Sequence, residues 1–154
     1  MADDKTFKVL AVNRLARHEY EVLETMEAGI VLTGTEIKSA RNGKVNIREA
    51  FARRTDGELW LYGAHIATYD PAGKDQHDPT RARKLLLHRE QIAKLAYEVE
   101  SKKLTLVPLK IYIKRHRAKV DLALVRGRKQ YDKREVIAKR DAERDIRRAM
   151  RRPV

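Results

Sequence analysis

The residues best suited to do chemistry form a polar run, NRLARHEY, at residues 13–20. Amide, guanidinium, imidazole and phenol groups of this kind bind phosphates, base edges and 2′-hydroxyls, or stack on unpaired bases. The run is therefore a candidate RNA contact, and a solvated N-terminal arm is the alternative of about equal weight. The groups in question belong to Asn13, Arg14, Arg17, His18 and Tyr20.

Motifs for catalysis or metal binding are missing from the sequence. The two serines, Ser39 and Ser101, do not stand in a nucleophile elbow, and the seven glycines are scattered singly instead of forming a phosphate loop. The five histidines show neither i,i+4 nor HExxH spacing, and there is no cysteine. His18 and Glu19 are adjacent, so on a strand they would point to opposite faces. We expect no catalytic residue, no metal site and no cofactor.

The charge of the chain predicts a polyanionic partner. Its 154 residues include 35 Lys or Arg against 22 acidic residues, which gives a net charge of +13 and a pI near 10.1. Nucleic acid is favoured over a membrane surface, because no stretch approaches the roughly 20 apolar residues of a spanning helix. The N-terminus lacks the layout of a signal peptide, and the absence of cysteine gives no link to an oxidising compartment. We expect a cytoplasmic protein.

The elements that must position these groups follow from periodicity. Alternation predicts a long strand over residues 20–32, with a bend or bulge near Gly29. A helix should follow, because Thr33 and Glu36 have capping-box spacing and Gly43 suits the C-terminal cap. This helix leaves two cations, Lys38 and Arg41, pointing outward.

The middle of the chain alternates between strands and connections. Residues 44–69 predict two or three strands, and residues 70–83 predict a surface loop whose basic end is a plausible contact. A second helix is expected over residues 88–101. The cations at the end of the loop are Arg81, Arg83 and Lys84.

Two strongly alternating strands come next, joined by a basic hinge at residues 114–117. Thr105, Val107, Leu109, Ile111 and Ile113 are predicted to share one face of the first strand, and Ala118, Val120, Leu122 and Leu124 one face of the second. The opposite faces would then present Lys110, Tyr112 and Lys119 as a positive, partly aromatic surface of the kind found on RNA-binding barrels.

These elements predict a mainly β fold with flanking helices. We expect a small antiparallel OB-type β-barrel over residues 13–125, preceded by a flexible lead-in at residues 1–12. Residues 126–154 have a different character: 12 Lys or Arg stand against 5 acidic residues, and apolar residues are too sparse for a core. This basic C-terminal tail is expected to be disordered when free and helical when it binds a polyanion.

Several short strings, taken in their order and spacing, resemble the SmpB (small protein B) family, the bacterial partner of transfer-messenger RNA (tmRNA) in trans-translation. The resemblance spans nearly all of residues 13–134. It is carried by NRLARHEY at 13–20, EAG at 27–29, GTEIKSARNGKVNI at 34–47, DPTRARKLLLH at 78–88, LTLVPLKIY at 104–112 and GRKQYDKR at 127–134.

The resemblance implies a non-enzymatic RNA adaptor that binds the tRNA-like domain of tmRNA and carries it, with elongation factor Tu through the tmRNA complex, to stalled ribosomes. We expect a monomer that contacts no membrane. The RNA-binding positions implied by the family are Asn13, Arg17, Glu27, Leu86 and Lys119.

The family also implies a role for the tail, which would enter the decoding centre and the empty mRNA channel of the ribosome against small-subunit rRNA. From Gly127 onward, the positions expected to act there are Gly127, Arg128, Lys129, Tyr131, Asp132, Lys133, Arg134, Lys139, Arg140, Arg144 and Arg148.

Two other interpretations remain open from the residues alone. A ribosomal or ribosome-assembly protein is also basic and often tailed, but it would accompany all ribosomes instead of stalled ones. An RNA-processing enzyme would need a convergent acid–base or metal site, and RNA turnover that depends on a metal would reveal one.

Overall fold

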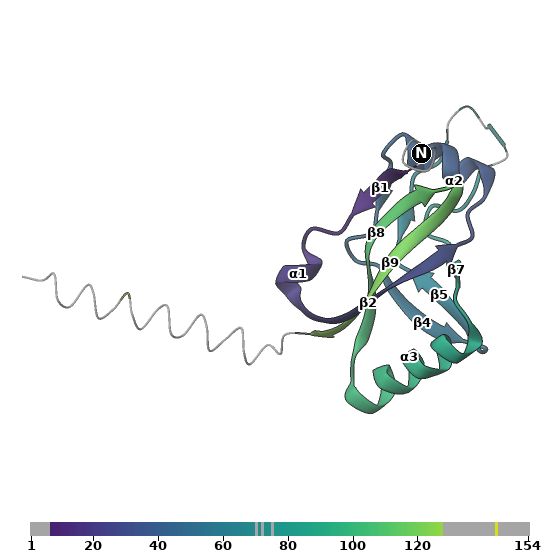
Figure 1. Ribbon diagram of the computed structural model, residues 1–154. Helices are drawn as coiled ribbons and strands as arrows, with labels where there is room; N and C mark the ends of the chain where they lie inside the picture. Colours follow the sequence, from purple (N-terminus) through teal and green to yellow (C-terminus); the bar gives the residue numbers. More distant parts are fainter. Residues whose placement is uncertain (1–6, 70, 72, 75, 128–143, 145–154) are drawn as a thin grey trace, which may run out of the picture.

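The computed structural model describes residues 7–69, 71, 73–74, 76–127 and 144. Strands dominate these residues, and three helices flank them (Figure 1). The strands are β1 (Lys8–Val12), β2 (Tyr20–Ile30), β3 (Val45–Asn46), β4 (Phe51–Thr55), β5 (Glu58–Tyr62), β6 (His65–Ile66), β7 (Arg83–Leu86), β8 (Thr105–Lys114) and β9 (Arg117–Gly127). The helices are α1 (Ala16–Glu19), α2 (Gly34–Arg41) and α3 (Arg89–Lys102).

The main sheet closes on itself to form a barrel. Its strand order is β1-β8-β4-β5-β7-β2-β9, and β8 pairs with β9 as well, so six strands form a ring to which β1 is added along β8. All pairs are antiparallel, and β3 and β6 form a separate two-stranded sheet. The predicted small antiparallel OB-type barrel is confirmed.

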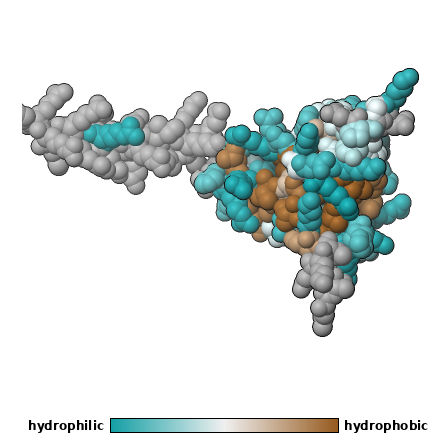
Figure 2. Space-filling model, turned by 90° about the horizontal axis from the view of Figure 1, so that it is seen from above, coloured by the Kyte–Doolittle hydropathy of each residue, from teal (hydrophilic) through white to brown (hydrophobic). Residues whose placement is uncertain are grey.

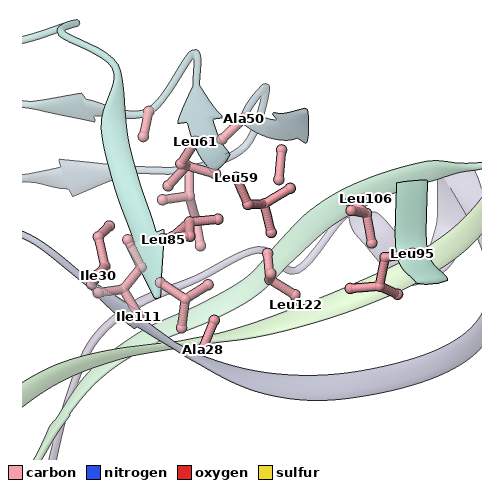
Figure 3. Close-up of a cluster of buried hydrophobic side chains, with 14 of the residues drawn as sticks. Ala28, Ile30, Ala50, Leu59, Leu61, Leu85, Leu95, Leu106, Ile111 and Leu122 are labelled. Atoms are coloured by element: carbon pink, nitrogen blue, oxygen red, sulfur yellow. The ribbon is translucent and has the colours of Figure 1, made fainter. Parts of the chain in front are cut away.

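The barrel interior holds the main hydrophobic core (Figure 3). Leu59 and Leu61 of β5, Leu85 of β7, Ile111 of β8 and Leu122 of β9 are each at most 1% exposed. Helix α3 closes one end of the barrel, and its Ile92 and Leu95 join this core. Apolar burial of this extent is the main favourable term in folding.

Helix α2 begins and ends as its sequence predicts. The Thr33 hydroxyl accepts a hydrogen bond from the Glu36 backbone N–H, and the Glu36 carboxylate accepts one from the Thr33 backbone N–H. Gly43 follows the helix with a φ of +75°, a conformation that glycine adopts without strain. The predicted helix over residues 88–101 is likewise confirmed as α3.

The N-terminal region departs from expectation. Residues 8–12, predicted as part of a flexible lead-in, form β1, which pairs along β8 and adds Leu10 to the core. Residues 16–19, for which no element was predicted, form the short helix α1, so Arg17 and His18 project from a helix. At the other end of the barrel, β9 continues to Gly127, two residues past the expected boundary of the tail.

The irregularity of β2 lies elsewhere than predicted. In β2 the register shifts between Val22 and Glu24, while Gly29 pairs regularly on both sides. Gly29 instead allows a close approach, since a Cβ atom there would lie 3.1 Å from the Leu86 Cβ atom.

In β8 the register shifts between Pro108 and Lys110, which moves the side chains that follow to the other face. Val107 and Leu109 therefore pack in a second small cluster outside the main core, whereas Ile111 and Ile113 belong to the core. The prediction that all five alternating residues of this strand share one face is wrong.

Candidate nucleic-acid interface

Three predicted RNA-binding residues meet on the outer face of the barrel. In the register of the sheet, Gly29 of β2 pairs with Leu86 of β7 on one side and with Lys119 of β9 on the other. Glu27 precedes Gly29 by two residues on the same face and pairs with Asp121. The sheet thus places Leu86, Glu27 and Lys119 together although they are far apart in the sequence.

A groove of about 520 Å³ runs over this part of the sheet. Its floor is apolar, with Leu86 51% exposed, and Arg117 and Lys119 supply cations at its side. The end of the molecule at which α2 lies shows such an apolar area bordered by hydrophilic residues (Figure 2). We call the groove the β2–β7–β9 groove. Its lining residues are Gly29, Ile30, Val31, Leu32, Ile37, Leu86, Arg117, Ala118 and Lys119.

A charged network holds the carboxylate next to the groove. The Tyr112 hydroxyl donates a hydrogen bond to Glu27 and lies 3.1 Å from the Asp121 Oδ1 atom. Lys114 Nζ lies 3.8 Å from Glu27, and Lys110 Nζ lies 3.5 Å from Asp121. Cations and carboxylates therefore alternate on this face, so Glu27 can accept hydrogen bonds from an RNA base or 2′-hydroxyl beside cations that suit phosphate.

The same contacts keep Glu27 ionised. The Tyr112 hydrogen bond lowers the pKa of Glu27, burial opposes it, and the charges of Lys114 and Lys119 lower it further. Conversely, burial and the two neighbouring carboxylates raise the pKa of Tyr112 well above its usual range. Tyr112 therefore remains a neutral donor.

The exchange Tyr112→Phe should raise the pKa of Glu27 toward its ordinary value, because the largest stabilising contact of the carboxylate is lost. A titration of the Glu27 carboxyl carbon by NMR measures this shift. The matched control is Tyr62→Phe, whose hydroxyl bonds to Thr55 at 2.8 Å and should leave the pKa of Glu27 unchanged. A pKa that stays the same in Tyr112→Phe would show that the cations alone hold the carboxylate ionised.

Tyr112, predicted to be part of a positive and partly aromatic surface, is buried. It is 3% exposed, and the ring of Phe7 packs against it with the centroids 5.2 Å apart. The Lys110 ammonium lies 5.3 Å from the centroid of Tyr112 and 5.8 Å from that of Phe7. The exposed ring at this place is therefore Phe7, which is 45% exposed.

The predicted residues of the N-terminal run lie in a second region, beside α1. Asn13 is buried: its backbone N–H donates to the Leu109 carbonyl, and its side-chain amide donates to the carbonyls of Ile47 and Pro108. This gives Asn13 a role in holding the fold, and its RNA contact stays a prediction. Ala16 anchors α1 in the small cluster of β8 and β9, which leaves Arg17 and His18 exposed.

Two clefts border this N-terminal region. One of about 680 Å³ is lined by Tyr20 and Asn13 among others, and one of about 430 Å³ is lined by Arg14 and Asn13. The predicted RNA-binding residues therefore form two separate groups, one at the groove and one beside these clefts.

Helix α2 forms a wall of the groove through Ile37. Its predicted cations are exposed, with the Lys38 ammonium 5.7 Å from the centroid of Tyr69. The Arg41 carbonyl accepts a hydrogen bond from Lys8 Nζ at 2.9 Å.

One predicted contact is wrong. Arg83, expected at the basic end of a surface loop, is 0% exposed, and its Nε atom donates to Glu36 at 2.6 Å. Arg81 pairs with the other oxygen of the same carboxylate. Both cations bind Glu36 of α2, Arg83 from a buried position on β7 and Arg81 from a partly exposed one just before it. Arg117, noted only as part of the basic hinge, lines the groove.

Most of the predicted tail residues lie outside the described residues. Gly127 ends β9 and pairs with Tyr20, and Arg144 is exposed. Outside the description are Arg128, Lys129, Tyr131, Asp132, Lys133, Arg134, Lys139, Arg140 and Arg148.

Two further observations concern the part of the chain that the structure describes. Within it, no group of three or more histidine or acidic side chains is placed to hold a metal ion. No helix in the same part is long and apolar enough to cross a membrane.

Comparison with known families assigns the chain to a family, since the model of the family described as SmpB protein matches residues 10–152. The chain belongs to the SmpB family. It is 60% identical to the SsrA-binding protein of Chloroflexus aggregans over 147 residues, which cover 95% of this chain and 93% of that protein. It is 54% identical to the SsrA-binding protein of Desulfitobacterium hafniense, over 94% of this chain and 92% of the relative.

A solved structure of the SmpB family is also similar in fold. It is described as "tmRNA-SmpB: a journey to the center of the bacterial ribosome", and one of its chains matches with a TM-score of 0.67 and 51% identity. The match covers 83% of this chain and 94% of the solved one.

Proposed function

We propose that this SmpB-family protein binds the tRNA-like domain of tmRNA and carries it to stalled ribosomes for trans-translation. The observation that carries the proposal is that Leu86 and Lys119 line one groove on the outer face of the barrel, with Glu27 two residues from the groove residue Gly29 on β2. An apolar floor with cations at its side suits RNA, whose phosphates need cations and whose unpaired bases need apolar contacts.

The protein acts by binding, without catalysing a reaction. It works in the cytoplasm as a monomer, and elongation factor Tu joins it through the tmRNA complex. The basic tail enters the decoding centre and the empty mRNA channel, where it takes the place of codon–anticodon pairing. The relatives called SsrA-binding proteins and the solved tmRNA-SmpB structure support the choice of RNA and of ribosome.

The groove can be tested by the dependence of RNA affinity on salt. Each phosphate that a cation neutralises adds about 0.7–0.9 to the slope of log affinity against log salt. Lys119→Ala should weaken binding of the tRNA-like RNA and reduce this slope by about one contact. Fluorescence anisotropy with labelled RNA over a salt series measures both quantities.

A matched control for this exchange is Lys102→Ala, in the last turn of α3 outside the groove. It removes the same charge and should leave the slope unchanged. An unchanged slope in Lys119→Ala would remove this residue from the interface. Failure of the wild-type protein to bind the tRNA-like RNA would overturn the proposed function itself.

A further inference from the structure

The outward residues of three neighbouring strands form a surface that the groove does not include. Figure 1 shows β5 between β4 and β7 on one flank of the barrel. Phe51 pairs with Tyr62, Arg53 with Trp60, and Trp60 with Lys84. Residues that pair across neighbouring strands lie on the same face, and the residues between them, such as Leu61, belong to the core. We call these five outward residues the β4–β5–β7 face.

Aromatic rings and cations contact each other on this face. The rings of Phe51 and Tyr62 are stacked, with centroids 5.7 Å apart and planes at 25°. The Arg53 guanidinium lies 5.1 Å from the centroid of Tyr62, whose hydroxyl bonds to Thr55 at 2.8 Å. Phe51 is 39% exposed and Arg53 is exposed, so both side chains remain accessible from solvent.

The charge of the face is positive. Lys84 lies 2.9 Å from Glu58, in a pair whose side chains are 39% and 48% exposed. Glu58 is the first residue of β5 and pairs with Thr55 in the register. Two cations against one carboxylate, in a chain with a net charge of +13, favour a polyanion over an acidic or neutral apolar partner.

The β4–β5–β7 face continues into the β2–β7–β9 groove. Lys84 and Leu86 stand two residues apart on β7, so their side chains lie on the same face of the sheet, about 7 Å apart along the strand. Leu86 lines the groove and pairs with Gly29, which in turn pairs with Lys119. A ligand in the groove can therefore extend across β7 onto β5 and β4 without leaving the barrel surface.

We propose that the β4–β5–β7 face binds unpaired nucleotides of the same RNA whose folded part occupies the groove. Aromatic rings stack on any base, and cations beside them attract the phosphates, so such a surface binds single strands with little sequence preference. The inference rests on the proposed function, because it assigns a second contact to the same RNA.

The single tryptophan of the chain, Trp60, provides a direct test because it lies on this face. Titration of the full-length protein with an oligoadenylate of about 12 nucleotides, a length within the range that such folds bind, should quench its fluorescence. Heparin, a polyanion without bases, should bind without equal quenching. Equal quenching by heparin, or none by the oligoadenylate, would overturn the inference.

Variants then separate stacking from bulk charge. Arg53→Glu and Phe51→Leu should each weaken oligoadenylate binding by about tenfold, a loss typical of one base–aromatic contact. The matched control is Arg54→Glu, which makes the same charge change one residue away, on the face where Arg54 pairs with Leu59. It should weaken binding by less than about threefold. Equal losses of oligoadenylate affinity in Arg53→Glu and Arg54→Glu would show that only net charge matters, and would contradict the proposal.

The tRNA-like RNA distinguishes failure of this inference from failure of the proposed function. If that RNA binds and responds to Lys119→Ala while the β4–β5–β7 variants bind oligoadenylate normally, only the second contact is wrong. A photo-crosslinker placed at position 51 should react with RNA in the tmRNA complex on ribosomes. Crosslinks to ribosomal protein alone would assign the face to a protein partner instead. Circular dichroism melting of each variant verifies that the barrel remains folded.

Discussion

A protein that lacks residues 131–154 is expected to bind the tRNA-like RNA within a few fold of the full-length affinity, while peptide tagging on stalled ribosomes falls to background. The described core closes before the deleted segment, since β9 ends at Gly127 and the buried residues of both clusters precede it. The groove residues lie on β2, β7, β9 and α2 and in the connection between β2 and α2. Binding and ribosome rescue should therefore separate.

The small loss of RNA affinity expected for the truncated protein follows from its lower net charge. The deletion lowers the net charge from +13 to +9, because the segment contains 9 Lys or Arg against 5 acidic residues. Long-range attraction weakens, but the contacts in the groove persist. Anisotropy with the tRNA-like RNA and a tagging assay on ribosomes stalled at an mRNA end measure the two effects.

A useful control replaces residues 131–154 with the same residues in scrambled order, which preserves their charge. If the scrambled tail supported tagging at the wild-type rate, charge alone would be sufficient. Unfolding of the truncated protein, or a loss of RNA affinity of about 100-fold, the effect expected from several phosphate contacts, would contradict this division of labour.

Local patterns in the sequence predicted the elements whose causes are local. The capping box of Thr33 and Glu36 gave the start of α2, and strict alternation located β9, because both signals depend on residues a few positions apart. β1 escaped prediction because its five residues are stabilised by pairing with β8, about 100 residues further along the chain.

The sequence-based prediction of which side chains are buried failed where contacts with residues distant in the sequence decide it. A register shift between Pro108 and Lys110 turned half of β8 to the other face, and alternation in a sequence does not reveal such a shift. Arg83 looked like an exposed loop cation, yet it is buried against Glu36, 47 residues earlier.

The candidate site also depends on contacts between residues that are distant in the sequence. Leu86 came from family resemblance alone, whereas strand alternation also pointed to Lys119, and no local pattern joins the two residues. They meet because Gly29 lies between them in the sheet and has no side chain to hold β7 away. Sequence reasoning noted Arg117 as a basic residue, but its place at the groove depends on the pairing of β9 with β2.

The exchange Glu36→Ala should destabilise the protein by roughly 3–5 kcal/mol, because it leaves Arg83 buried without its partner. The Glu36 carboxylate and the Arg83 side chain are both 0% exposed, and Arg81 bonds to the same carboxylate. Arg83 also donates hydrogen bonds to the carbonyls of Ala64 and Pro79. Its guanidinium therefore cannot reach water unless these hydrogen bonds break and β7 separates from the neighbouring chain segments. Urea unfolding measured by circular dichroism gives the free energy.

The matched control is Glu58→Ala, which removes a carboxylate from the exposed pair with Lys84. Surface ion pairs contribute little, so its cost should be at most about 1 kcal/mol. Equal costs for the two exchanges would mean that burial of the Glu36–Arg83 pair does not matter.

The pH dependence of unfolding provides an independent measure of the same contact. Burial opposes the ionisation of Glu36, but hydrogen bonds from Arg81, the Thr33 backbone and Arg83 outweigh it and hold the pKa below its ordinary value of 4.5. A carboxyl whose pKa is lower in the folded state binds fewer protons there than in the unfolded state. Its contribution is therefore complete above the ordinary pKa and is lost as the pH falls through the lowered one.

Glu36→Gln removes this titration while it keeps a similar shape. Its free energy of unfolding should consequently fall less steeply than that of the wild type as the pH drops below 4.5. The remaining slope would come from other carboxyl groups with lowered pKa values, such as Glu27. Identical acid slopes in the wild type and in Glu36→Gln would show that the carboxylate of Glu36 is not what acid disrupts.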